Sequence, residues 1–528
     1  MTTITIREAN NATPCLYAGK RSRHIAKHLL ATAVIFAVSS TAMAEQLGFK
    51  GDVTEAMGQK YSSSNLPVEA AEAHTPRPGA ESIKRLFYWN QIATNSEKID
   101  HTPVAPGETR VFGEQFGPAR AGRALAIVHI AIFDAVNAVT GGYQSYSGIP
   151  HVRVETSVDA AIAQAAHDAL VAVYPSQRPR LDVLLAEDLG HIGNPHAKAS
   201  GIALGQQAAA AILALRANDG SQRAEPKVGS EFIPSNQPGK WRPDPVSQNP
   251  LALGAYWGSV KPFVLQSGSQ FRIPAPPALT SPAYAQAYEL SQRLGGSTAG
   301  TSRTPEQTII GTYWAYDGVP NLGAPPRLYN QITAHIVKQY SKDSLIEHAR
   351  LLALINVAVA DAGIAAWESK YYYMVWRPVG GIRESDTGTG PTGLGDGNPA
   401  TIGDPNFVPL GAPADNLVGP DFTPPFPSYP SGHATLGSAL FQTLRMYYGK
   451  DGVPFTFVSD EFDGVTRDNH GNVRPLMPRS FSSLTQAEEE NGMSRIYLGV
   501  HWLFDSTEGI KLGHKVADYV FKHAFQPQ

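Results

Sequence analysis

The chain has 528 residues, of which 42% are hydrophobic and 17% are charged, and its formal net charge is −3. This is the composition of an ordinary globular protein, and the length indicates one large domain or two that pack closely. The nearly balanced charge excludes a strongly basic nucleic-acid-binding protein, so we expect no nucleic-acid partner.

Residues 21–44, RSRHIAKHLLATAVIFAVSSTAMA, have the pattern of a secretory signal peptide. Basic residues precede an apolar stretch, and Ala42-Met43-Ala44 is a small-residue cleavage site. A membrane anchor is the alternative, but the apolar stretch is short for a span. We therefore predict a signal peptide over 1–44 and a secreted or periplasmic protein.

Removal of residues 1–44 has two consequences for the mature chain. It takes away five Lys or Arg and one acid, leaving 38 bases, 45 acids and a net charge of −7. It also removes Cys15, the single cysteine, so the mature protein has no disulfide, thiolate ligand or cysteine nucleophile. No later segment is expected to be long and apolar enough to span a membrane.

The pattern after the leader is helical. We predict an entry segment over 45–118 with one helix near 81–94, an N-terminal helical half over 119–300, and a C-terminal helical half over 301–528. Apolar residues at helical spacing predict helices at 121–139, 157–175, 197–220, 283–294, 304–317, 328–340, 343–376, 432–448, 485–497 and 503–523. The fold class is all-α, a large bundle of two four-helix-bundle-like halves, with at most a short hairpin.

Long loops rich in Gly, Pro and Asp separate these helices, above all at 378–430 and 449–482. Loops of that length in a compact protein are often functional. We expect both to cover the end of the bundle where the site lies, and the first to carry Phe426 into that site.

Two cations stand seven residues apart in WESKYYYMVWRPVGG, residues 367–381. On a helix that Pro378 ends, Lys370 and Arg377 would leave the same face and form an anion site. A solvated charge pair is the alternative.

FPSYPSGHATLG, residues 426–437, places Ser431, Gly432 and His433 where a helix begins. A helix N-terminus offers free N–H groups and a positive dipole end to an oxyanion, and His433 could act there as an acid or base. The alternative is a serine cap with a packed histidine ring.

In SRIYLGVHWLFDS, residues 494–506, His501 and Asp505 have i, i+4 spacing, so the carboxylate can orient the imidazole. Gly499 marks a bend that could bring Arg495 and His501 toward one point. A surface ion pair is the alternative.

Together these blocks read Lys-x6-Arg-Pro, Pro-Ser-Gly-His and Ser-Arg-x5-His-x3-Asp, and they resemble the superfamily of vanadium-dependent haloperoxidases and type 2 phosphatidic acid phosphatases. YWAYDG (313–318), PPRLYNQI (325–332), DAGIAAWESK (361–370) and PPFPSYPSGHATLG (424–437) look like the fungal-type vanadium chloroperoxidases. The similarity covers about 310–510, whereas the N-terminal third matches only as a helical pattern.

The resemblance implies vanadate as the cofactor and His501 as its only protein ligand. Lys370, Arg377 and Arg495 would neutralise the oxyanion, Ser431 and the Gly432 N–H would donate hydrogen bonds, and Lys370 would also polarise the peroxide. His433 would carry protons, while Asp317 would pair with Arg495 and Asp505 would support His501. The alternative for Asp317 is a helix-end carboxylate.

Trp367 and Phe426 match the apolar halide-side positions of chloroperoxidases. In algal bromoperoxidases the position of Phe426 is typically His. Plain core packing is the alternative for both rings.

The implied activity is oxidation of bromide, and by the Phe426 match also chloride, with hydrogen peroxide to hypohalous acid or a halogenated organic acceptor. A homodimer is expected as the assembly. The alternative function is a secreted acid phosphatase that acts through a phosphohistidine at His501. A non-enzymatic oxyanion-binding protein is the third interpretation, which the presence of both His433 and His501 disfavours.

Overall fold

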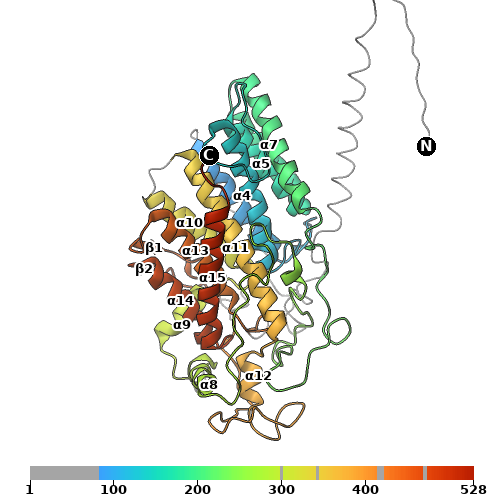
Figure 1. Cartoon of the computed structure of the whole chain (residues 1–528), viewed down its shortest axis with the longest axis vertical. Coiled ribbons are helices and arrows are strands. Elements are labelled where there is room, and N and C mark those ends of the chain that lie inside the picture. Colours follow the sequence, from blue (N-terminus) through green and yellow to red (C-terminus); the bar gives the residue numbers. More distant parts are fainter. Residues whose placement is uncertain (1–81, 298–300, 341–343, 413–420, 468–471) are drawn as a thin grey trace, which may run out of the picture. The chain divides into compact units, whose positions relative to one another are not determined.

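The computed structural model describes residues 82–297, 301–340, 344–412, 421–467 and 472–528 (Figure 1). These residues all belong to one compact unit, Leu47–Gln528. The signal peptide predicted at 1–44 and the first half of the entry segment, 45–81, lie outside the described residues. The described chain is mostly helical, which confirms the predicted all-α class.

The helices and strands of the described chain follow in sequence order. The α-helices are α3 (Ser82–Asp100), α4 (Pro118–Thr140), α5 (Val158–Val173), α6 (Arg178–Gly190), α7 (Pro195–Arg216), α8 (Pro282–Gly295), α9 (Pro305–Tyr313), α10 (Pro325–Tyr340), α11 (Leu345–Tyr373), α12 (Pro378–Arg383), α13 (Gly432–Tyr448), α14 (Leu484–Tyr497) and α15 (Leu503–His523). Short 3-10 helices lie at Pro175–Gln177, Trp257–Ser259 and Asp460–Phe462. Strands β1 (Phe455–Phe457) and β2 (Arg479–Phe481) pair antiparallel, with Phe455 opposite Phe481.

Helix α11 is the element around which the others are arranged. It packs against α4 of the N-terminal helices and against α13 and α15 of the C-terminal helices (Figure 1). Its apolar run is buried almost without interruption because neighbours surround it. The last turn of α11 and the first turns of α13 and α15 carry residues of the candidate site.

The prediction that no segment after the leader could span a membrane needs correction. Both α4 and α11 are long and apolar enough by length and composition. Their apolar windows are, however, 94% and 100% buried inside the protein. They therefore have the burial of core helices, whose surroundings are other helices.

The structure also extends the helix that was predicted near 81–94 in the entry segment. Helix α3 extends to Asp100, beyond the predicted end at 94, and Leu86, Trp89 and Ile92 are fully buried. Two helices were not predicted. Helix α6 buries only Leu181 and Asp188, so its sequence has little periodicity, and the six-residue α12 lies inside the loop predicted at 378–430.

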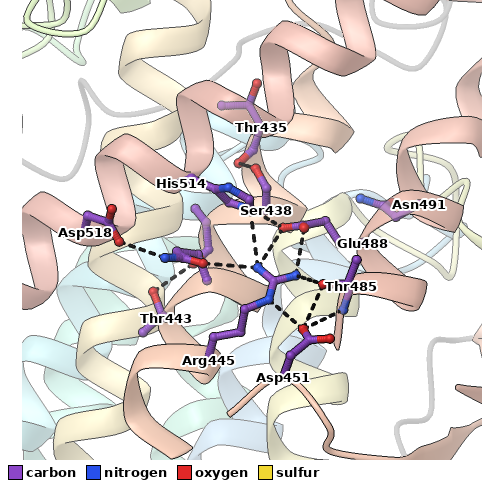
Figure 2. Close-up of polar contacts among 12 residues, drawn as sticks. Thr435, Ser438, Thr443, Arg445, Asp451, Thr485, Glu488, Asn491, His514 and Asp518 are labelled. Atoms are coloured by element: carbon purple, nitrogen blue, oxygen red, sulfur yellow. Dashed lines mark hydrogen bonds and ion pairs between the residues drawn. The ribbon is translucent and has the colours of Figure 1, made fainter. Parts of the chain in front are cut away.

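A polar network ties α13, α14 and α15 together (Figure 2). Arg445 of α13 donates to Glu488 of α14 at 2.7 Å and to Asp451 at 2.7 Å. The ring of His514 on α15 bonds the same Glu488 at 2.8 Å. Each of these helices has a site residue in a terminal turn or next to it, so the network helps to fix their relative position.

Candidate anion pocket

The last turn of α11 and the segment after it hold the first two cations. The prediction that Lys370 and Arg377 share one helix face is wrong, because α11 ends at Tyr373 with Met374 in the left-handed conformation. Arg377 precedes Pro378, which disfavours helical backbone, and it is extended with φ −79° and ψ 158°.

Both cations are nevertheless buried and close to His501. The Lys370 ammonium donates to the carbonyl oxygens of Pro427 and Ser428, at 2.9 Å each, and of Pro430. Arg377 Nη1 donates to His501 Nε2 at 2.9 Å. Burial lowers the pKa of both, that of Arg377 to about 9, so Arg377 keeps its charge at neutral pH.

The first turn of α13 supplies the next group of residues. Ser431 caps the helix and accepts from the backbone N–H of Ala434 at 3.3 Å. The N–H of Gly432 belongs to the first turn, whose amides have no acceptor within the helix. His433 Nε2 lies 2.6 Å from the carbonyl oxygen of Ala315, so this nitrogen carries the ring proton and donates it.

The environment of His433 keeps the ring neutral. Burial and the nearby Arg495 guanidinium lower its pKa well below the usual histidine value. Because Nε2 donates to a carbonyl, the Nδ1 of a neutral ring is unprotonated. His433 is therefore a buried ring in the first turn of α13 whose Nδ1 is unprotonated.

The third cation, Arg495 in the last turn of α14, is held by a buried carboxylate. Its Nη1 and Nη2 donate to the two oxygens of Asp317 at 2.9 and 2.7 Å, a bidentate arrangement. Helix α9 ends at Tyr313, so Asp317 lies in the following segment and not at a helix end. Gly499 turns the chain after α14 with φ +70°, as its predicted bend requires.

His501 lies in the turn between α14 and α15. Its Nδ1 donates to Asp505 Oδ2 at 2.8 Å, and the same oxygen accepts from the Trp502 N–H at 3.0 Å. His501 lies just before α15 and Asp505 lies in its first turn, so the two side chains meet at the start of the helix and not along one helix face. Since Arg377 can only donate, His501 Nε2 is the unprotonated nitrogen.

The polar groups converge on one pocket of about 560 Å³, open solvent at its mouth included. Asp317, Gly432, His433, Arg495 and His501 form its polar side. Lys370, Arg377 and Ser431 are not among the residues that line it, and their exposed fractions are 0%, 3% and 0%. They therefore form a buried layer against which the lining residues rest.

Apolar side chains complete the lining of the pocket. Trp367 and Phe426 both line it, with ring centroids 4.9 Å apart, and Phe426 comes from the long loop as expected. Sequence reasoning missed Phe116, Gly117, Pro118 and Leu253, which also line the pocket. They carry no chemical motif, and only the tertiary packing of the N-terminal helices brings them there.

Two donors, one in the buried layer and one in the pocket lining, identify what the pocket can hold. Arg377 Nη2 and Arg495 Nε are buried and have no hydrogen-bond partner among the described residues. Unpartnered charged donors beside an unprotonated imidazole nitrogen suit a small oxyanion whose central atom accepts a nitrogen ligand. The fold and site define a helical protein with a buried oxyanion pocket.

Comparisons with known proteins identify the family. Residues 350–527 match the family model described as the VCPO second helical-bundle domain. The chain is 31% identical over 520 residues to vanadium chloroperoxidase of Curvularia inaequalis, covering 81% of this chain and 80% of that protein. The chain belongs to the family of vanadium-dependent haloperoxidases.

Solved structures support the same fold. The chain resembles a bacterial vanadium-dependent iodoperoxidase with a TM-score of 0.65 and 22% identity, over 86% of this chain and 99% of that one. It resembles a holo-type bacterial vanadium-dependent chloroperoxidase with a TM-score of 0.56 and 20% identity, over 79% and 94%. The predicted helical fold is therefore confirmed, as the predicted family is by the 31% identity to the Curvularia inaequalis protein.

Proposed function

We propose that this chain is a vanadate-dependent haloperoxidase whose buried pocket binds vanadate and which uses hydrogen peroxide to oxidise bromide. The observation that carries this proposal is the convergence of Arg377 Nη2, Arg495 Nε and His501 Nε2. Two charged donors without partners among the described residues and one unprotonated nitrogen match the needs of an oxyanion with a Lewis-acidic centre.

The residues present fit this cofactor. Arg377 and Arg495 would neutralise the oxyanion, while Asp505 fixes the His501 ring through Nδ1. His501 Nε2 accepts from Arg377 Nη1 in this structure, and it would bind the ligand once that guanidinium turns toward the oxyanion. Bound vanadate supplies a Lewis acid that activates peroxide toward a halide. Overall, hydrogen peroxide, a halide ion and a proton give hypohalous acid and water.

His433 is the proton carrier in this proposal. Its Nδ1 is unprotonated because Nε2 donates to Ala315, and its lowered pKa keeps it free to accept a proton from hydrogen peroxide. Lys370, fixed by three carbonyl oxygens, holds the 427–430 segment and adds positive charge. Its predicted role in polarising peroxide stays a prediction.

The apolar wall bears on the halide. Trp367 and Phe426 line the pocket, and the buried cations lie over their rings, with Lys370 Nζ 5.6 Å from the Trp367 centroid and Arg377 4.9 Å from the Phe426 centroid. We propose bromide as the halide oxidised most readily, with chloride also a substrate because Phe426 is apolar. Hypohalous acid, or the halogenated form of an organic acceptor, is the product.

Export and assembly stay predictions. A secreted or periplasmic location rests on residues 21–44, and size measurement of the exported protein would test the cleavage near Ala44. Sedimentation velocity would test the homodimer.

A vanadate titration tests the proposed activity. Protein freed of vanadate should not oxidise bromide, and activity should return in proportion to added vanadate up to one equivalent. Bromide oxidation that is the same with and without vanadate would overturn the proposal.

A further inference from the structure

Two small cavities continue from the anion pocket toward the N-terminal helices. The first has about 190 Å³, open solvent included, and shares five lining residues with the anion pocket: Phe116, Gly117, Pro118, Leu253 and Trp367. The second has about 180 Å³ and shares four with the first: Arg120, Glu225, Gly254 and Trp257. The second cavity is also lined by Arg223, which is exposed. The two cavities and the anion pocket therefore form a row that begins at Arg223 on the surface and ends at Trp367.

The second cavity contains two buried donors that the protein does not use. Ser221 Oγ and Trp257 Nε1 have no hydrogen-bond partner among the described residues. Both residues line this cavity, and their exposed fractions are 2% and 3%. A buried donor left without an acceptor costs free energy, so two of them at one cavity point to a ligand that accepts.

Arg120 adds positive charge to the same cavity. Four of its five N–H groups donate to described residues: Nη1 to Ser221 O at 2.7 Å, Nη2 to Arg223 O at 2.7 Å, and Nε and Nη2 to Glu225 Oε1 at 3.0 and 2.9 Å. One hydrogen on Nη1 is left over. The guanidinium carbon lies 5.1 Å from the ring centroid of Trp257, which fixes both groups together.

Glu225 is the carboxylate that lines this cavity, and both of its oxygens already accept hydrogen bonds from other residues that line it. Oε1 accepts from Arg120, and Oε2 accepts from the backbone N–H of Gly254 at 2.5 Å. The Arg120–Glu225 pair is neutral as a unit. The groups that remain for a ligand are therefore the hydroxyl of Ser221, the indole N–H of Trp257 and one guanidinium N–H.

We propose that the cavity lined by Ser221 and Trp257 binds a halide ion on its way to the Trp367 side of the anion pocket. This inference rests on the proposed function, because only a halide-oxidising enzyme needs such a supply. Two N–H donors and a hydroxyl that can turn its hydrogen toward the ligand suit a monatomic anion, which only accepts. Because Glu225 neutralises Arg120, the site offers the halide hydrogen bonds but no net positive charge. Binding is therefore weak, which lets the ion leave again toward the anion pocket.

Bromide-soaked crystals of the vanadate-free protein test the binding site directly. We expect a bromide anomalous peak within hydrogen-bond distance of Ser221 Oγ and Trp257 Nε1. Trp257→Phe keeps the ring but removes the N–H, and Ser221→Ala removes the hydroxyl, so each should weaken or abolish the peak. Ser259→Ala is the matched control, because its hydroxyl donates to Tyr256 O at 2.7 Å and it does not line the cavity.

Steady-state kinetics of the vanadate-loaded enzyme test the passage. Each of the two cavity variants should raise the KM for bromide roughly five-fold, the effect of one neutral hydrogen bond, with kcat and the KM for peroxide unchanged. The control should match the wild type in all three. Ser221→Ala carries this test if Trp257→Phe does not fold.

Two results would overturn the inference. The absence of a bromide peak in wild-type crystals would refute the site. A peak with an unchanged bromide KM in the variants would mean an adventitious ion only. Diffraction needs neither vanadate nor turnover, so failure of the proposed function, seen as absent bromide oxidation, is distinguishable from failure of this site.

Discussion

Replacement of Gly499 by alanine should displace Arg495 and His501, both on the polar side of the anion pocket, relative to each other. Gly499 has φ +70°, and a Cβ there would lie 2.2 Å from the carbonyl oxygen and 2.8 Å from the carbonyl carbon of Gly295. Left-handed backbone costs about 1–2 kcal/mol for a residue with a Cβ. Displacement of backbone adds about 1–3 kcal/mol, by analogy with overpacked cores. We expect a total loss of about 2–5 kcal/mol of folding free energy.

Gly449→Ala is the matched control for this prediction. Gly449 has φ +64°, but a Cβ there meets nothing within 4 Å. The control should therefore lose only about 1–2 kcal/mol, from backbone strain. Urea denaturation followed by tryptophan fluorescence compares the two variants with the wild type.

The same pair of variants reports on the site. Gly499 connects the segment that carries Arg495 to the segment that carries His501. A shift of the backbone there would change the distance between these two side chains, and a displacement of about 1 Å is enough to impair a binding site. Vanadate affinity, measured by equilibrium dialysis, should fall at least ~10-fold in Gly499→Ala and stay unchanged in Gly449→Ala. Equal stabilities of the two variants, with wild-type affinity in both, would refute the reasoning.

Four further predictions concern single residues. His501→Ala should abolish tight vanadate binding in equilibrium dialysis, and an unchanged affinity would refute its role as ligand. His433→Ala should lower kcat by about 10²-fold or more while vanadate affinity changes little, because proton transfer is lost; an equal loss of both would contradict this. Phe426→His should favour bromide over chloride in competitive assays because it places a polar ring in the apolar wall; an unchanged ratio would count against that wall as a selector. Burial raises the pKa of Glu97 from 4.5 to about 8, so its contribution to stability is present below pH 4.5 and lost as the pH rises to about 8; Glu97→Gln should remove this dependence from denaturation midpoints, and an identical pH profile would contradict it.

Helix positions were predictable where local signals agree with the fold. Helices α13 and α15 begin and end at the predicted residues, because a serine cap opens the first and apolar periodicity runs through both. The end of α11 was not predictable to the residue. Met374 takes the left-handed conformation there, a choice that no local composition signals.

The site was predictable as a set of residues but not as a geometry. The resemblance placed Lys370, Arg377 and His501 together, yet the expected shared helix face of the two cations does not exist. Their convergence is tertiary, since Arg377 reaches the site from the N-terminus of α12 and His501 from the turn before α15.

The apolar wall shows a second limit of sequence reasoning. Phe116 and Leu253 come from segments far from the motifs, and an isolated apolar residue has no signal that separates a pocket wall from a core. The unused donors of Ser221 and Trp257 are also visible only once burial and hydrogen bonds are known.

One paired assay tests the central claim most directly. A single preparation, with and without vanadate, would be offered bromide with hydrogen peroxide in one reaction and a phosphate ester in another. We predict vanadate-dependent bromide oxidation, with vanadate inhibiting any ester hydrolysis because both anions need the same pocket. Phosphate-ester hydrolysis without any bromide oxidation would contradict the account.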